Sequence, residues 1–130
     1  MNLSGKVAVI TGGGRGIGRG IVDRFREAGA QVAVVQRRTL DSELDADPNV
    51  LHIEADLSDP ATPEYVVQRA GEAFGGVDIL VNNAGVMFEK HLSELTVDDW
   101  DVMAAINCAR RCFWHRRLCR SFKNAARAAS

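Results

Sequence analysis

A glycine-rich segment near the start of the chain has the composition of a phosphate-binding turn. Residues 11–18 read TGGGRGIG, and they lie between the apolar run Lys6–Thr11 and a stretch with apolar residues at helical spacing. A turn that joins a strand to a helix presents unpaired backbone N–H groups and the positive end of the helix dipole, and both attract phosphate. Glycines let the chain turn tightly and let a pyrophosphate approach the backbone. The segment therefore predicts a nucleotide phosphate site, in preference to a glycine turn without a ligand.

The segments around this turn alternate between strand and helix patterns. Apolar residues at helical spacing predict helices over residues 17–28 and 63–74, each followed by glycine. The connection at residues 40–49 is acidic and contains proline, so we expect at most a helical turn in a surface segment. Short apolar runs predict four buried strands: Lys6–Thr11, Gln31–Val35, Val50–Ala55 and Val77–Val81.

This alternation predicts the fold class. Continuous apolar strands with helices between them are typical of a parallel sheet covered on both faces. Right-handed crossovers then favour the strand order 3-2-1-4. We therefore expect an α/β fold in residues 1–107: an incomplete Rossmann-type, doubly wound parallel sheet of four strands.

Four motifs occur in an order that resembles one enzyme family. They are TGxxxGxG at residues 11–18, Asp56 after the third strand, Asn82-Asn83-Ala84-Gly85 after the fourth, and Trp100 followed seven residues later by Asn107. Alone, each of the last three could be an ordinary turn, loop or helix-face residue. Together, residues 3–107 resemble the N-terminal portion of the short-chain dehydrogenase/reductase family. Its members transfer hydride between NAD(P)(H) and a carbonyl or alcohol.

The resemblance implies a cofactor and the residues that bind it. In the family, the acid after the third strand contacts the adenine ring, and the NNAG motif stabilises the sheet and lines the cofactor. The family's helix asparagine belongs to the catalytic tetrad, so Asn107 is the implied catalytic residue, and no metal is implied. The implied cofactor-binding residues are Thr11, Gly12, Gly14, Arg15, Gly16, Ile17, Gly18, Gln36, Arg37, Asp56, Leu57, Asn83, Ala84 and Gly85.

Residues after the second strand indicate which dinucleotide binds. In NAD-preferring relatives an acid at the end of that strand accepts hydrogen bonds from both ribose hydroxyls, but Gln36 stands there in this chain. Arg37 and Arg38 follow, and guanidinium groups can pair with a 2′-phosphate that a carboxylate would repel. Arg15 resembles the second basic residue of NADP-preferring relatives. We therefore expect NADP(H) in preference to NAD(H); the alternative is that Arg37 and Arg38 are merely solvated.

The family's chemistry also requires a serine and a Tyr-x-x-x-Lys pair. The one tyrosine, Tyr65, is followed four residues later by Arg69, so we expect it at a helix surface or in packing. In relatives the required residues lie well downstream of the asparagine, past residue 130. We therefore expect a short-chain oxidoreductase that is truncated and inactive as given. The alternatives are a nucleotide-binding or dimer-forming regulatory fragment, and a non-functional product of a damaged gene.

Charge divides the chain near residue 107. Residues 1–107 carry nine Lys/Arg and all 17 Asp/Glu, whereas residues 108–130 carry seven Lys/Arg, no acid and all three cysteines. We interpret residues 108–130 as a tail produced by a shift of reading frame. A basic anion-binding tail, a metal site and a native but divergent helix stay open as alternatives. A metal is disfavoured because ligands strung over roughly three helical turns cannot converge on one tetrahedral ion; they would be Cys108, Cys112, His115 and Cys119.

Composition indicates the compartment and partners. Hydrophobic residues make up 46% of the chain and charged residues 25%, which is ordinary for a soluble globular protein. No stretch approaches the roughly 20 apolar residues of a membrane-spanning helix, and the N-terminus lacks a secretory signal pattern. We expect a cytoplasmic protein that binds a dinucleotide and, at full length, a small carbonyl or alcohol, but no membrane or nucleic acid. The strand Val77–Val81 would form an open sheet edge, so we also expect self-association.

Overall fold

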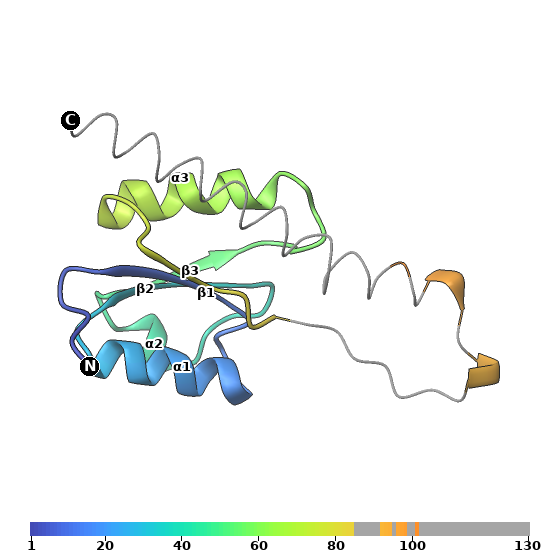
Figure 1. Cartoon of the computed structure of the whole chain (residues 1–130), viewed down its shortest axis with the longest axis horizontal. Coiled ribbons are helices and arrows are strands. Elements are labelled where there is room, and N and C mark those ends of the chain that lie inside the picture. Colours follow the sequence, from blue (N-terminus) through green and yellow to red (C-terminus); the bar gives the residue numbers. More distant parts are fainter. Residues whose placement is uncertain (85–91, 95, 99–100, 102–130) are drawn as a thin grey trace.

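The computed structural model describes residues 1–84, 92–94, 96–98 and 101. The elements follow one another as β1 (Val7–Thr11), α1 (Gly16–Glu27), β2 (Gln31–Gln36), α2 (Ser42–Asp45), β3 (Val50–Glu54), α3 (Thr62–Phe74), β4 (Ile79–Val81) and a short 3-10 helix (Leu92–Glu94). Up to β4 they form three layers, with α1 and α2 on one face of the sheet and α3 on the other (Figure 1). Among the described residues, no helix combines the length and apolar character that crossing a membrane requires.

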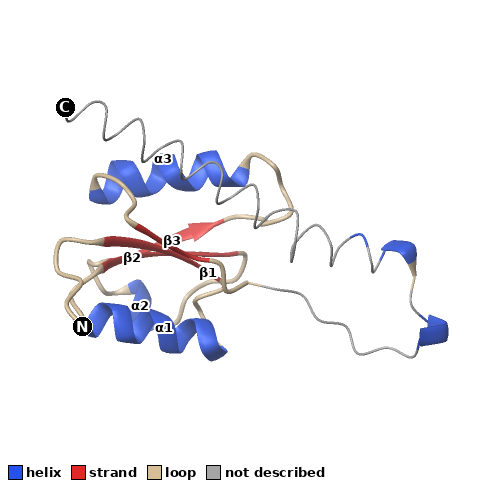
Figure 2. Ribbon diagram, viewed as in Figure 1, coloured by secondary structure: helices blue, strands red, loops and turns tan. Residues whose placement is uncertain are grey.

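The four strands run parallel in the order β3-β2-β1-β4 (Figure 2). Val9 of β1 is level with Ala33 of β2 and with Leu80 of β4. The predicted α/β class and the predicted strand order are therefore confirmed. Because parallel strands end at the same side of the sheet, the glycine turn after β1 and the arginines after β2 are brought to one edge.

Alternate residues of the central strands pack into two separate cores. Every residue of β1 is buried, as predicted for a strand that helices cover on both faces. Val9 belongs to the core on the α3 side, which includes Val66 of that helix. Ile10 belongs to the core on the opposite side, which includes Val22 of α1. This division follows from the two-residue period of a strand, and it fixes β1 between two layers of helix.

The connection between β2 and β3 is anchored in the interior. As expected, its helix α2 is only one turn, and the side chain of Asp41 caps it by accepting a hydrogen bond from the Leu44 N–H at 3.0 Å. Leu44 itself is fully buried in the core beneath α1. The acidic sequence around Leu44 did not indicate this burial. The other residues of the connection are exposed or half-buried, as expected of a surface connection. Leu44 thereby fixes the end of the loop that carries the arginines.

Ion pairs also join α1 to this connection. Arg26 pairs with Asp47 at 2.8 Å, and Arg19 pairs with Asp41. A hydrogen bond from the backbone of Asn49, together with the Arg26 guanidinium, holds the pKa of Asp47 below its ordinary value. The connection is therefore held by a buried leucine on one side and by charged contacts on the other.

Strand β4 is shorter than the predicted strand Val77–Val81. Asp78 is bonded to the start of β1: its Oδ2 accepts a hydrogen bond from the Val7 N–H at 2.9 Å, and its N–H donates to the Val7 oxygen at 2.8 Å. Regular pairing with β1 begins one residue later, at Ile79. All three residues of β4 are half-buried, and in the described part of the chain no strand pairs with the outer edge of β4.

Candidate functional site

The buried hydroxyl of Thr11 joins the carboxyl ends of β1 and β4. Thr11 Oγ1 accepts hydrogen bonds from the N–H groups of Asn83 and Ala84, both at 3.1 Å. It donates to the oxygen of Val81 at 3.4 Å. The Asn83 side chain adds a further link, since its Nδ2 donates to the Gly12 oxygen at 3.2 Å. The NNAG segment and the glycine turn are therefore bonded into one unit.

Two glycines of the turn are required by close packing within the protein. Gly12 has a φ of +67°, and a Cβ there would lie 3.1 Å from the Cα of Ala84. At Gly18, where α1 begins, a Cβ would overlap the Gly12 oxygen and the Asn83 amide nitrogen. The glycine pattern thus reflects contacts between the turn, the helix and the NNAG segment, in addition to any room left for a phosphate.

An open cleft of about 610 Å³ lies beside this unit, at the carboxyl ends of the strands. Its volume is within the range of about 300–1,000 Å³ that is typical of small-molecule sites. The residues that line it are Gly12, Gly14, Arg15, Val35, Gln36, Arg37, Arg38, Thr39, Ala55, Asp56, Leu57 and Ala84. Eight of them are predicted cofactor residues, so the structure brings segments from four parts of the sequence to one surface.

Five predicted residues are described but do not line the cleft. Thr11, Gly18 and Asn83 hold the turn together, while Gly16 and Ile17 begin α1, where Ile17 is 80% exposed. Four lining residues were not on the predicted list: Val35, Arg38, Thr39 and Ala55. Val35, Arg38 and Ala55 are each next to a predicted residue, and Thr39 is two residues from Arg37. Their position at the ends of β2 and β3 was the signal that could have identified them.

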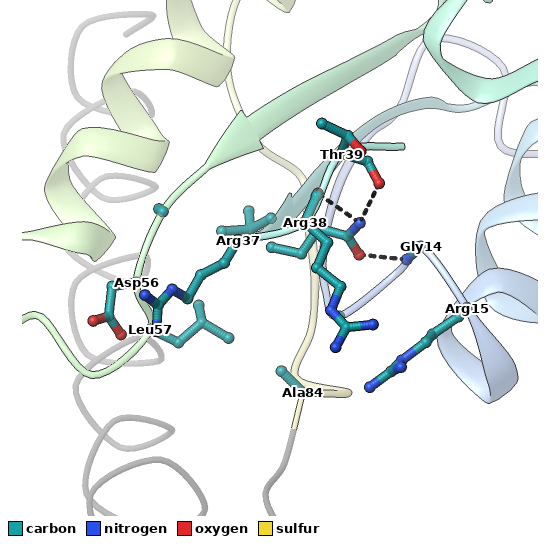
Figure 3. Close-up of a pocket in the computed structure, with 12 residues that line it drawn as sticks. Gly14, Arg15, Arg37, Arg38, Thr39, Asp56, Leu57 and Ala84 are labelled. Atoms are coloured by element: carbon teal, nitrogen blue, oxygen red, sulfur yellow. Dashed lines mark hydrogen bonds between the residues drawn. The ribbon is translucent and has the colours of Figure 1, made fainter. Parts of the chain in front are cut away.

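Three arginines stand at the cleft without an ionic partner among the described residues. In the part of the chain that the structure describes, Arg15, Arg37 and Arg38 form no ion pair, whereas Arg19 and Arg26 on α1 are bridged by carboxylates. Figure 3 shows Arg38 and Arg15 extending into the cleft from opposite walls, while Arg37 extends toward Asp56. The cleft therefore presents three guanidinium groups for which no ion pair is seen within the described residues.

Asp56 and Leu57 form the wall opposite the glycine turn. Asp56 Oδ1 accepts hydrogen bonds from the backbone N–H and the hydroxyl of Ser58, at 2.9 and 2.6 Å. The Asp56 backbone oxygen accepts another from the Thr62 hydroxyl at the start of α3. Asp56 is thus both a turn residue and part of the cleft, so the structural and the functional interpretations of this motif are compatible.

Gln36 connects two walls of the cleft. Its Oε1 accepts a hydrogen bond from the Gly14 N–H at 2.8 Å, and its Nε2 donates to the oxygens of Arg38 at 2.9 Å and Thr39 at 3.4 Å (Figure 3). The residue at the position of the family's ribose-binding acid is therefore hydrogen-bonded within the protein at both ends of its amide.

Tyr65 lies on the surface of α3, as expected from the sequence. It is 41% exposed, and its hydroxyl accepts a hydrogen bond from Arg69 at 3.0 Å. The predicted residues Gly85 and Asn107, and the four possible metal ligands of residues 108–130, lie outside the described residues. Within the described residues, no three His, Cys, Asp or Glu side chains are grouped so that they could hold a metal ion.

The parallel sheet, the glycine turn and the cleft at the strand ends define a Rossmann-type nucleotide-binding unit. The chain belongs to the short chain dehydrogenase family, whose sequence model matches residues 6–128. The matched range includes most of residues 108–130, and the origin of these residues stays a prediction. An uncharacterized oxidoreductase of Thermotoga maritima is 36% identical over 85% of this chain. The chain spans about half the length of the curated relatives it matches.

Solved structures of the family have the same fold. A short chain dehydrogenase of Burkholderia cenocepacia in complex with NADP superposes with a TM-score of 0.82 and 35% identity, covering 93% of this chain and 52% of that one. A 3-ketoacyl-(acyl-carrier-protein) reductase of Brucella melitensis complexed with NADH superposes with a TM-score of 0.87 and 35% identity, covering 98% and 55%. The family therefore includes proteins bound to either dinucleotide, so the fold by itself does not set the cofactor preference.

Proposed function

We propose that the cleft binds the adenosine end of NADP(H), and that the chain is the cofactor-binding part of an NADP(H)-dependent oxidoreductase acting on a carbonyl or alcohol. The observation that carries the proposal is the set of three arginines at the cleft that have no ionic partner among the described residues. A dianionic 2′-phosphate is the group that distinguishes NADP(H) from NAD(H). Arginine suits this group because its planar guanidinium can donate two parallel hydrogen bonds.

The residues that face the arginines support this choice. An acid at the end of β2 would repel a 2′-phosphate, and this position is occupied by the neutral Gln36. The carboxylate of Asp56 lies across the cleft, at the wall formed by the β3 end, and its position suits the adenine ring better than a phosphate (Figure 3). The NADP complex of the Burkholderia relative agrees with this assignment, while the NADH complex of the Brucella relative shows that the fold alone does not decide it.

The chain's own residues would bind and orient the cofactor. The N–H groups at the start of α1 would face the pyrophosphate, and Leu57 would cover the adenine. When bound, the nicotinamide accepts or donates the hydride. Proton transfer in this family requires a Tyr-x-x-x-Lys pair, and Tyr65 with Arg69 on α3 does not provide one. We therefore propose that the 130 residues alone bind the cofactor without turning over a substrate.

Substitution of one arginine tests the proposal. Arg37→Ala should weaken NADPH binding roughly 10- to 150-fold and leave NADH binding almost unchanged, because a hydrogen bond to a charged group is worth about 1.5–3 kcal/mol. Isothermal titration calorimetry of the 130-residue chain measures both affinities. Arg24→Ala is the matched control, since Arg24 is an exposed arginine of α1 that pairs with Glu27 and does not line the cleft. An equal loss for both dinucleotides would show that Arg37 does not contact the 2′-phosphate.

A further inference from the structure

The amide of Gln36 makes three hydrogen bonds, which we call the Gln36 bridge. One is accepted from the Gly14 N–H in the glycine turn, and two are donated to the backbone oxygens of Arg38 and Thr39 in the loop after β2. The amide nitrogen and the amide oxygen are thereby both bonded inside the protein. The bridge spans 22 residues of sequence and joins the two walls between which a 2′-phosphate would lie.

We propose that Gln36 is a positioning residue for cofactor choice: through the bridge it holds the backbone of Arg38 and Thr39 at a fixed place relative to the glycine turn. This inference rests on the proposed function and deepens it. The ligand it concerns is an adenosine that carries a 2′-phosphate. Gln36 acts on that ligand through the loop of Arg37, Arg38 and Thr39, and its own amide does not contact the ribose.

The exposure of the loop and the chemistry of the amide both support this role. Arg37, Arg38 and Thr39 are all exposed, so without the bridge their backbone would have to be ordered at the moment of binding. Ordering a loop before the ligand arrives removes that entropic cost from the binding free energy. A carboxylate at position 36 could accept from the Gly14 N–H but could not donate to the two carbonyls. Only an amide of this length serves both walls without adding negative charge.

The absence of a side chain at Gly14 fits the bridge. A Cβ on Gly14 would lie 2.6 Å from the amide carbon of Gln36 and would overlap its terminal atoms. The backbone of Gly14 is not in the left-handed region, so an alanine would not be strained by its φ. Glycine is needed at this position because the Gln36 amide occupies the space. Gly14→Ala should therefore displace the Gln36 amide without changing the charge of the cleft.

The test compares two nucleotides that differ only in the 2′-phosphate. Binding of 2′,5′-ADP and of 5′-AMP to the 130-residue chain is measured by NMR titration for the wild type, Gln36→Met, Gly14→Ala and the double variant. We expect each single variant to lower the ratio of the 2′,5′-ADP affinity to the 5′-AMP affinity about threefold to tenfold. The double variant should be no worse than either single one, because both remove the same bridge.

A matched control separates positioning from general loss of stability. Gly20 of α1 has open space where a Cβ would be and is not in the left-handed region, so Gly20→Ala should leave the nucleotide preference unchanged. Equal weakening of both nucleotides in Gln36→Met would show that Gln36 contacts the ribose directly. An unchanged preference in Gln36→Met or in Gly14→Ala, or a lowered preference in Gly20→Ala, would also overturn the proposal.

Hydrogen exchange tests the bridge without any nucleotide. The Gly14 N–H should be protected in the wild type and in Gly20→Ala, and should lose protection in Gln36→Met. Lack of protection in the wild type would refute the bridge itself. A wild-type chain with a protected Gly14 N–H that binds neither nucleotide would instead refute the proposed function, and the role in cofactor choice with it, while the bridge would remain as a structural contact.

Discussion

Replacing Thr11 with valine should separate the glycine turn from the NNAG segment. Valine has nearly the shape of threonine but lacks the hydroxyl that accepts from two N–H groups at the end of β4. The Asn83 N–H has a second acceptor, the Val81 oxygen at 3.1 Å, whereas no other acceptor is seen for the Ala84 N–H in the described residues. The cost is therefore mainly that of one backbone donor left without a partner in a partly buried place.

That cost can be stated as a free energy of unfolding. A buried donor without a partner costs about 1–3 kcal/mol, and the long bond from the Thr11 hydroxyl to Val81 adds little. We expect Thr11→Val to lower the free energy of unfolding by about 2 kcal/mol. For a urea m-value of about 1–3 kcal/mol per molar, the midpoint should fall by about 1 M. Urea unfolding of the 130-residue chain at a fixed protein concentration measures this shift.

Thr11→Ser distinguishes the hydroxyl from the packing around it. Serine keeps the acceptor and loses one buried methyl group, which costs about 0.5–1.5 kcal/mol. Because the two costs overlap, hydrogen exchange at the Ala84 N–H decides: it should be protected in the wild type and in Thr11→Ser, and exposed in Thr11→Val. Equal protection in all three proteins would refute the argument that Thr11 binds the end of β4.

Two further predictions concern acid stability and catalysis. The pKa of Asp47 is lowered on folding, by the Asn49 N–H first and then by Arg26, so its stabilising effect is present above about pH 4 and is lost as the pH falls through the folded-state pKa. Asp47→Asn should cost on the order of 1 kcal/mol in urea unfolding at pH 7, and this cost should shrink as the pH is lowered below about 4. A cost that does not change with pH would contradict the assignment. The 130-residue chain should show no NADPH oxidation with any carbonyl compound, because it lacks Tyr-x-x-x-Lys. Any NADPH oxidation would contradict this prediction. If the oxidation also persisted in Tyr65→Phe, a residue other than Tyr65 would have to transfer the proton.

Most of the fold followed from sequence patterns because the central strands are uniformly apolar. The runs at β1 and β2 have no polar interruption, and both are buried as predicted. The prediction failed where a single residue differs in polarity from its neighbours in the sequence. Asp78 is bonded to Val7 and delays the start of β4, and Leu44 is buried within an acidic segment. Both depend on contacts with distant residues, which periodicity along the chain does not report.

The sequence predicted which segments form the candidate site, but it did not predict the role of each residue within them. Motif order brought the glycine turn, the β2 end, Asp56 and Ala84 together correctly, because each follows a strand of one parallel sheet. Which of these residues face the cleft and which hold it together depends on side-chain bonds across 70 or more residues, such as Thr11 with Asn83. The composition of the turn could not distinguish a glycine that leaves room for a phosphate from a glycine that leaves room for the side chain of Asn83.

The structure also indicates which features of the cleft can vary independently. Arg15, Arg37 and Arg38 are exposed and form no ion pair within the described part of the chain, so replacing them should change cofactor affinity at little cost to folding. Thr11 is the opposite case, since it is buried and bonded but does not line the cleft. Gln36 belongs to both groups, because it lines the cleft and joins its walls. A change of cofactor made at the arginines alone would therefore leave the scaffold intact, whereas an acid introduced at position 36 would alter the charge of the cleft and break the bridge to the loop at the same time.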